Sequence, residues 1–154
     1  MAMQQATEKQ TITDHIKKDH RKTDQEIAEL EKRVKGPQDP SLEPVFVPMK
    51  QELLGHMAAE EKLVYPPLEK EMKEKVADAI KEHNEVRQLL DKLAAGGSMP
   101  ETEWTRLLQE MKQGIQHHVE EEEKEILPAF ERMFDREKLL QFGEEFDRME
   151  KQFK

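Results

Sequence analysis

The 154-residue sequence contains no cysteine, and that absence excludes several kinds of site. Disulfides, thiolate metal sites, iron–sulfur clusters and cysteine nucleophiles all need the missing side chain. Any metal would therefore have to be held by histidine, glutamate, aspartate or tyrosine, a donor set that suits iron, manganese or zinc. A chain without cysteine also fits a cytoplasmic protein, and we expect a cytoplasmic location.

Long apolar runs and an excess of positive charge are missing as well. No stretch approaches the length of a membrane span, and the polar start does not resemble a signal peptide, so we expect no membrane association. The formal net charge is −9, and an acidic surface repels phosphate backbones, so we expect no nucleic-acid partner. Strand-like alternation is almost absent, with "VFV" at 45–47 as the one short candidate.

Helical periodicity is the feature that the sequence has in abundance. Apolar residues in steps of three and four give one stripe to each of four long segments, at 12–34, 45–63, 72–93 and 104–126. Breaks rich in proline, glycine or aspartate separate them, at 36–44, 65–71, 94–102 and 127–137. This pattern predicts an all-α, antiparallel up-down four-helix bundle.

The two ends of the chain complete the predicted organisation. Residues 1–11 are polar and are expected to be a flexible N-terminus, and residues 12–154 to form one bundle domain. Phe142, Phe146, Met149 and Phe153 recur in helical steps. They predict an additional short C-terminal helix, which packs on the bundle or on a partner subunit in a homodimer.

Histidines interrupt the apolar stripes of the predicted helices. Of six histidines, four continue the stripe of their own helix, one on each helix: His20, His56, His83 and His118. On two helices a glutamate follows one turn later, Glu60 after His56 and Glu122 after His118. An inward glutamate in a bundle core is costly unless something compensates its charge.

An internal repeat supports this alignment. Residues 19–30 align with 82–93 at an offset of 63, and residues 56–66 align with 118–128 at an offset of 62. The chain is therefore predicted to be two helical hairpins related by approximate two-fold symmetry. The repeat also selects His118 over His117 and Glu122 over Glu121 as the inward pair.

Each predicted hairpin supplies one histidine and then a His-x-x-x-Glu pair. On a helix a four-residue step puts both side chains on one face, so the doubled pattern gathers four histidines and two carboxylates around one buried point. That set can hold two metal ions bridged by carboxylates. Non-haem iron suits it best, with manganese or zinc as alternatives. The competing interpretation, hydrogen-bonded core histidines beside a solvated charged face, does not explain the repeat.

Several further side chains are left open by the sequence. His15 and His117 are expected at the surface, each with an alternative role beside the site. Glu123 is expected to be solvated but is the best alternative oxygen ligand. Tyr65 lies nine residues after His56, roughly opposite on an ideal helix, but the double proline that follows it distorts this region, so a role near the metal stays open. Two more glutamates are expected to be solvated, Glu61 and Glu121.

The order H, H-x-x-x-E, H, H-x-x-x-E, with each H-x-x-x-E helix running into a proline, resembles the hemerythrin-like family, or HHE cation-binding domains. The matching pieces are "KKDHRKTD", "HMAAEEKLVYPPLE", "KEHNEVRQLL" and "HVEEEEKEILPAF", and the resemblance covers residues 12–130. It implies a four-helix bundle with a non-haem di-iron centre in which Glu60 and Glu122 bridge the irons together with an oxo or hydroxo group. The ligands that it implies are His20, His56, Glu60, His83, His118 and Glu122.

One departure from the family pattern bears on function. Oxygen-carrying hemerythrins have His-x-x-x-His on the third helix, whereas Arg87 lies four residues after His83 here. Arginine is not a ligand, and we expect Arg87 to extend to the surface, with an inward donor role as the alternative. The missing fifth histidine argues against simple oxygen carriage and favours open metal positions.

Two functional hypotheses follow. The first is a di-iron protein that binds or processes a small ligand, namely O2, peroxide or nitric oxide; peroxidase-, catalase- or nitric-oxide-directed activity would connect it with oxidative or nitrosative stress. The alternative is an iron or oxygen sensor, or a storage protein, whose metal state is read by a partner. A purely structural bundle is the third class, and the repeat argues against it.

Overall fold

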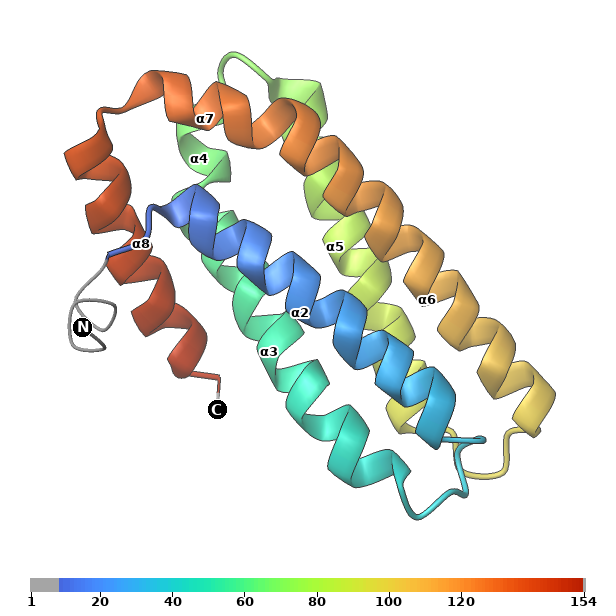
Figure 1. Cartoon of the computed structure of the whole chain (residues 1–154). Coiled ribbons are helices and arrows are strands. Elements are labelled where there is room, and N and C mark those ends of the chain that lie inside the picture. Colours follow the sequence, from blue (N-terminus) through green and yellow to red (C-terminus); the bar gives the residue numbers. More distant parts are fainter. Residues whose placement is uncertain (1–8, 154) are drawn as a thin grey trace, which may run out of the picture.

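The computed structural model describes residues 9–153, and every regular element within that range is helical. Four long helices run antiparallel and form a bundle (Figure 1). They are α2 (Ile12–Arg33), α3 (Leu42–Leu63), α5 (Lys73–Ala94) and α6 (Glu101–Glu121). The predicted all-α four-helix bundle is therefore confirmed, and the short strand candidate at 45–47 is part of a helix. Residues 1–8 lie outside the described range, so the flexible N-terminus stays a prediction.

The breaks between helices are shorter than the sequence suggested. The double proline at 66–67 falls inside a single-turn helix, α4 (Tyr65–Leu68). After α6 the chain does not break at residue 127, as predicted, but continues through a wide π-helical turn, η1 (Glu122–Ile126), into α7 (Leu127–Met133). Pro128 lies in the first turn of α7, directly after the wide turn. The helix ends only at Phe134, which is extended.

The core consists of two apolar clusters with a polar layer between them. One cluster is built around Ile27, Leu90 and Trp104, and the other around Ile16 and Phe130. Along each long helix a buried histidine lies between residues of the two clusters. The predicted site thus lies at mid-height in the bundle, between two apolar clusters that shield it from water.

One residue that the predicted stripes placed in the core lies at the surface. Ile80, three residues before His83 in the predicted stripe at 72–93, is 36% exposed. Ala79 is buried in its place and lies four residues before His83. His83 is nevertheless buried, because residues three and four apart share one helix face and either step leads to it.

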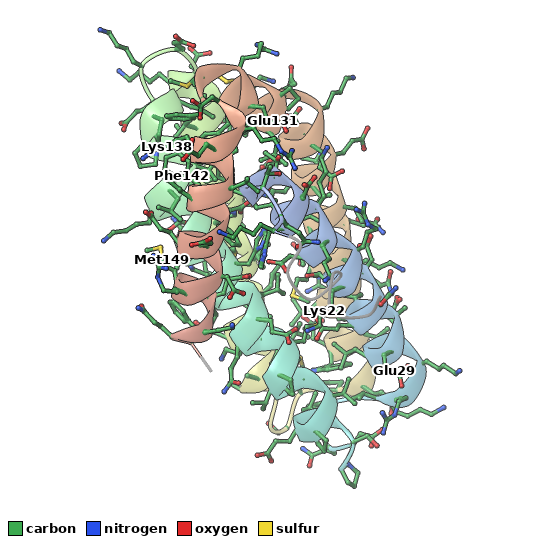
Figure 2. All side chains as sticks on the ribbon, turned by 60° about the vertical axis from the view of Figure 1, so that its left-hand side comes forward. Lys22, Glu29, Glu131, Lys138, Phe142 and Met149 are labelled. Carbon is green, nitrogen blue, oxygen red and sulfur yellow. The ribbon has the colours of Figure 1, made fainter. Side chains whose placement is uncertain are left out.

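The C-terminal helix α8 (Arg136–Lys151) packs on the chain's own bundle, beside α2 and α3 (Figure 1). Asp135 caps its start by accepting a hydrogen bond from the Lys138 backbone N–H. Phe146 on its inner face is fully buried. Farther up the helix, Lys138 and Phe142 lie side by side (Figure 2), with the ammonium 4.9 Å from the ring centre. No helix of the described residues is long and apolar enough to cross a membrane.

Candidate metal centre

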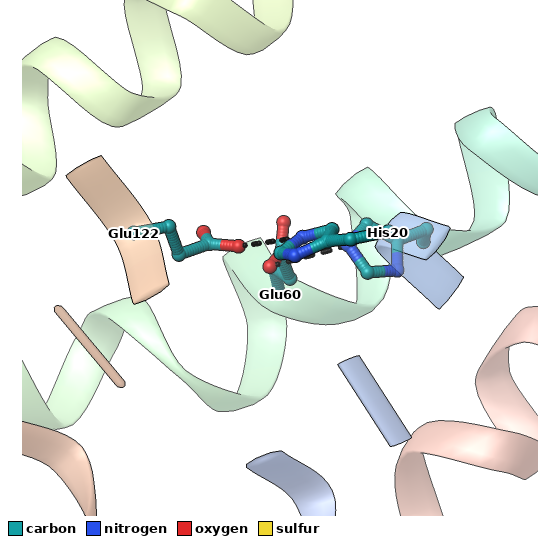
Figure 3. A group of neighbouring side chains, drawn as sticks. His20, Glu60 and Glu122 are labelled. Atoms are coloured by element: carbon teal, nitrogen blue, oxygen red, sulfur yellow. Dashed lines mark ion pairs between the residues drawn. The ribbon is translucent and has the colours of Figure 1, made fainter. Parts of the chain in front are cut away.

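Six buried side chains from four helical segments converge in the polar layer. Glu60 and Glu122 have no exposed surface at all. The four histidines are buried beside them: His20, His56, His83 and His118. Figure 3 shows His20 and Glu122 approaching from opposite sides toward Glu60. The structure therefore brings together all six residues that the sequence singled out.

The two carboxylates each span two histidines. Glu60 lies with Oε2 3.3 Å from Nε2 of His56 and with Oε1 3.1 Å from Nε2 of His83. Glu122 lies with Oε1 3.1 Å from Nε2 of His20 and with Oε2 3.3 Å from Nε2 of His118. The donor atoms form two groups that could each hold a cation and that share both glutamates. We call them the first half-site (His20, His56, Glu60, Glu122) and the second half-site (His83, His118, Glu60, Glu122).

Every histidine of the two half-sites is held from behind by a carboxylate at Nδ1. The Nδ1 atom is 2.7 Å from Glu123 in His20, 2.9 Å from Asp19 in His56, 2.7 Å from Glu61 in His83 and 2.8 Å from Glu82 in His118. An ionised carboxylate only accepts, so Nδ1–H donates, and in the neutral imidazole Nε2 keeps its lone pair for the centre. Metal-binding histidines are oriented in this way in proteins generally.

This orientation creates a requirement for positive charge in the second half-site. The Nε2 atoms of His83 and His118 lie 3.1 Å apart. With both Nδ1 atoms donating to carboxylates, two lone pairs would face each other, and only a cation or a proton between them relieves the repulsion. Within the described residues, three buried atoms of the centre also have no hydrogen-bond partner: His56 Nε2, Glu60 Oε2 and Glu122 Oε1. Orphaned donor atoms at this spacing fit a metal-binding site.

The charge balance of the centre leads to the same conclusion. Burial alone would lower the pKa of His118, but its contacts with Glu122 and Glu82 raise that pKa to about 10. The pKa values of His20 and His56 are also raised, because neighbouring carboxylates outweigh burial. Protonated imidazoles thus supply the charge that the buried carboxylates attract. A bound cation would supply the same charge and take over the nitrogens.

Tyr65 lies in the centre itself, although its sequence spacing suggested the opposite side. Its hydroxyl donates to Oε2 of Glu122 at 2.5 Å and lies 3.2 Å from Nε2 of His83 and 3.5 Å from Nε2 of His118. The spacing misled because α3 ends at Leu63 and Tyr65 begins the separate short helix α4. The tyrosine therefore lies beside the second half-site.

The π-helical turn explains how two consecutive glutamates both reach the centre. In a regular helix Glu123 would lie about 140° round from His118 and point away from it. The wider turn at 122–126 lets Glu122 span His20 and His118 while Glu123 reaches Nδ1 of His20. Wide turns of this kind often occur at functional sites. The expectation that Glu123 is solvated was wrong, and its place is behind a histidine.

Other predicted positions fall outside the two half-sites. His117 is exposed, with its ring 3.5 Å from Glu82, and Glu121 contacts Lys75. Arg87 does not simply extend into solvent: its guanidinium donates two hydrogen bonds to Glu61. Burial opposes ionisation of Glu61, but hydrogen bonds from His83 and Arg87 lower its pKa to about 2. Glu61 was also expected to be solvated, and that was wrong.

The sequence reasoning missed the carboxylates behind the histidines, yet the repeat contained the signal. Asp19 and Glu82 directly precede the first histidine of each hairpin and are 63 positions apart. Glu61 and Glu123 directly follow the spanning glutamates and are 62 positions apart. The same two-fold relation that pairs the central residues therefore pairs their supports.

A small apolar cavity of about 30 Å3 borders both half-sites. Five apolar side chains contribute to its lining: Leu53, Met57, Val86, Ile115 and Val119. A cavity of this size has room for about one water-sized molecule. The centre is therefore enclosed by protein but has space beside it.

The fold and the centre together define a class: a helical bundle whose buried histidines and glutamates can bind cations. The family model of the Hemerythrin HHE cation binding domain matches residues 11–130. The chain belongs to this family. A hemerythrin-like protein of Schizosaccharomyces pombe, described as uncharacterized, is 29% identical over 144 residues, covering 91% of this chain and 69% of the yeast protein. No solved structure matches the chain significantly.

Proposed function

We propose that this protein is a non-haem di-iron protein that binds or processes a small oxygen or nitrogen species, namely O2, peroxide or nitric oxide. The observation that carries the proposal is the sharing of Glu60 and Glu122 between two donor groups. A carboxylate with one oxygen on each side can bridge two ions. The first ion would be held by His20 and His56, and the second by His83 and His118.

Iron is the metal that this donor set supports best. Imidazole and carboxylate together suit non-haem iron, with manganese or zinc as alternatives. The membership of the chain in a cation-binding family supports a metal in general, and the residue types support iron in particular. When bound, iron would supply redox chemistry toward small molecules at positions that the protein leaves open.

The proposed role of Tyr65 answers the question of the missing fifth histidine. The side of the centre that lacks this histidine is the one with His83 and His118, and the Tyr65 hydroxyl lies beside both of them. Arg87, at the position of the absent histidine, holds Glu61 instead. We infer that the phenol oxygen completes the second half-site. No equivalent phenol serves the first half-site, because the repeat places Leu127 there.

The small apolar cavity supports a small uncharged ligand. Its volume of about 30 Å3 excludes organic substrates of ordinary size, which need several hundred Å3. Its apolar lining favours molecules that lose little hydration on entry. O2 and nitric oxide are small and weakly hydrated, so they suit both the volume and the lining of the cavity. Peroxide suits its volume.

An assay of consumption separates an enzyme from a binding protein. Iron-loaded protein should consume peroxide or nitric oxide faster than the same concentration of free iron does. Glu122→Ala, which removes one spanning carboxylate, should abolish the excess rate, and Glu121→Ala should keep it. Rates no better than free iron would leave binding without turnover as the function.

The position of α8 favours a sensor as the second candidate function. This helix touches a proposed ligand, since Glu150 Oε2 lies 3.7 Å from Nδ1 of His56. A change in metal occupancy could therefore alter a surface element that a partner reads. A homodimer through α8 is a further expectation, although the inner face of the helix is used within its own chain. Light scattering of the metal-loaded protein tests the dimer.

A further inference from the structure

The helix α8 lies outside the segment that matches the family, which ends at residue 130, yet it contacts the proposed metal centre. The contact lies behind the ring of His56. Two side chains of α8, Phe146 and Glu150, meet that ring. The contact therefore involves the first half-site and has no counterpart in the internal repeat, since the repeat ends before α8.

The side chain of Glu150 lies in a small network of half-buried groups. Its Oε1 accepts a hydrogen bond from Nε2 of His15 at 2.6 Å, and its Oε2 lies 3.7 Å from Nδ1 of His56. Asp19, which holds the same Nδ1 at 2.9 Å, completes the network. A second carboxylate therefore lies near Nδ1 of His56, in addition to the one that is hydrogen-bonded to it.

Phe146 fixes the plane of the same histidine ring. It is fully buried and packs edge-on against His56, with ring centres 5.4 Å apart and an angle of 77°. It also packs against His15, the anchor of Glu150, at 5.3 Å. Edge-on aromatic pairs of this geometry are attractive beyond simple burial, so Phe146 favours one orientation of the His56 ring.

A glycine lets α8 come close enough to make these contacts. Gly55 directly precedes His56 on α3, and a Cβ atom at this position would lie 3.0 Å from the backbone oxygen of Glu150 and 3.3 Å from its Cα. Glycine is otherwise unfavourable within a helix relative to alanine. The close approach of the two backbones explains its presence beside a ligand.

We propose that α8 is a working part of the metal centre: Glu150 and Phe146 position His56 for the first half-site, so that docking of α8 and metal occupancy there stabilise each other. The inference rests on the proposed function. If metal binds best when His56 is held in place, bound metal stabilises the docked helix by mass action. Conversely, loss of the helix contact lowers the affinity for metal. A change in metal occupancy would thereby change how firmly α8 is docked at the protein surface.

Hydrogen exchange of the wild-type protein tests the coupling without any substitution. The amides of 136–151 should exchange more slowly in iron-loaded protein than in protein treated with a chelator. The amides of the loop at 94–100, far from α8 along the bundle, serve as the internal reference. Unchanged exchange in 136–151 on loading would overturn the proposal.

Metal release from variants tests the coupling from the other side. Glu150→Ala should speed the release of one metal equivalent to a chelator by about 10–100-fold and leave the other nearly unchanged, as expected for loss of a group that orients a ligand. Glu150→Gln, which keeps an oxygen acceptor, should recover part of the loss. Glu144→Ala is the matched control, because Glu144 is an exposed residue of α8 that pairs with Lys9.

Gly55→Ala provides an independent variant, because it adds a methyl group against the α8 backbone at Glu150 and leaves the carboxylate of Glu150 in place. It should also speed release of one equivalent, despite the better helix propensity of alanine. Wild-type release rates in Glu150→Ala and Gly55→Ala would refute the role of α8 while leaving the metal centre intact. A wild-type protein that binds no metal would refute the proposed function itself, and this proposal with it.

Discussion

The hydroxyl of Tyr65 donates a hydrogen bond to Oε2 of Glu122 at 2.5 Å, deep in the bundle and across the gap between two helical hairpins. Burial and the carboxylates of Glu122 and Glu60 raise the pKa of Tyr65 well above its ordinary value. The phenol therefore keeps its proton while it faces these carboxylates. A cation held by Glu122 would compete for the same oxygen and draw the phenol toward the metal.

Tyr65→Phe should change both the stability of the metal-free protein and the spectrum of the iron-loaded protein. Loss of the donor to a buried carboxylate should lower the free energy of unfolding of the chelator-treated protein by about 1–3 kcal/mol, measured in urea. If the phenol oxygen binds ferric iron, the loaded wild-type protein should show a phenolate charge-transfer band. That band has one source, because the chain has a single tyrosine. An identical spectrum in Tyr65→Phe would exclude the ligand role.

Glu123→Ala should weaken metal binding without removing a ligand. Glu123 accepts from Nδ1 of His20, so its loss should lower the affinity of the first half-site by about 10–100-fold. Two equivalents should still bind at saturating metal, as shown by titration against a competing chelator. Complete loss of one equivalent would instead show that Glu123 is itself a ligand, which was the alternative left open by the sequence.

The stability of the chain should depend on pH through Glu26, which lies in a polar cavity between α2, α3 and α8. Burial and the neighbouring Glu52 raise the pKa of Glu26 from 4.5 to about 8. Between these values the folded protein binds more protons than the unfolded chain, so the free energy of unfolding falls as pH rises. Glu26→Gln should remove this contribution.

Thermal unfolding of the wild-type and Glu26→Gln proteins at pH 5 and pH 8 checks the sign. The variant should gain in melting temperature relative to the wild type as the pH is raised. The effect is small, because Glu26 is half-exposed and solvent screens its charge. A difference between the two proteins that does not change with pH would contradict the account.

The fold and the central residues could be predicted because both depend on periodicity. Steps of three and four residues place an apolar stripe on each helix, and a histidine in that stripe must face the core. The repeat then selected Glu122 over its glutamate neighbours, which periodicity alone could not do. Ile80 shows the limit, since two adjacent residues can serve one stripe and the structure buries Ala79.

The remaining features depended on breaks in that periodicity. Tyr65 follows the end of α3, so counting along one ideal helix gave it the wrong direction. The π-helical turn after Glu121 has no signature in residue spacing and turns Glu123 inward. The contact of Glu150 with His56 depends on how α8 packs back on the bundle, a tertiary relation that a local pattern does not contain.

The metal content of the purified protein after anaerobic reconstitution with iron tests the central claim most directly. The account predicts two iron ions per chain in the wild type and in Glu121→Ala, and a loss of metal in Glu122→Ala, because Glu122 lies between the two half-sites whereas Glu121 contacts Lys75 outside them. The two variants differ by one position in a run of glutamates, so general effects of charge are matched. Well under two ions per chain in the wild type, or equal content in both variants, would contradict the account.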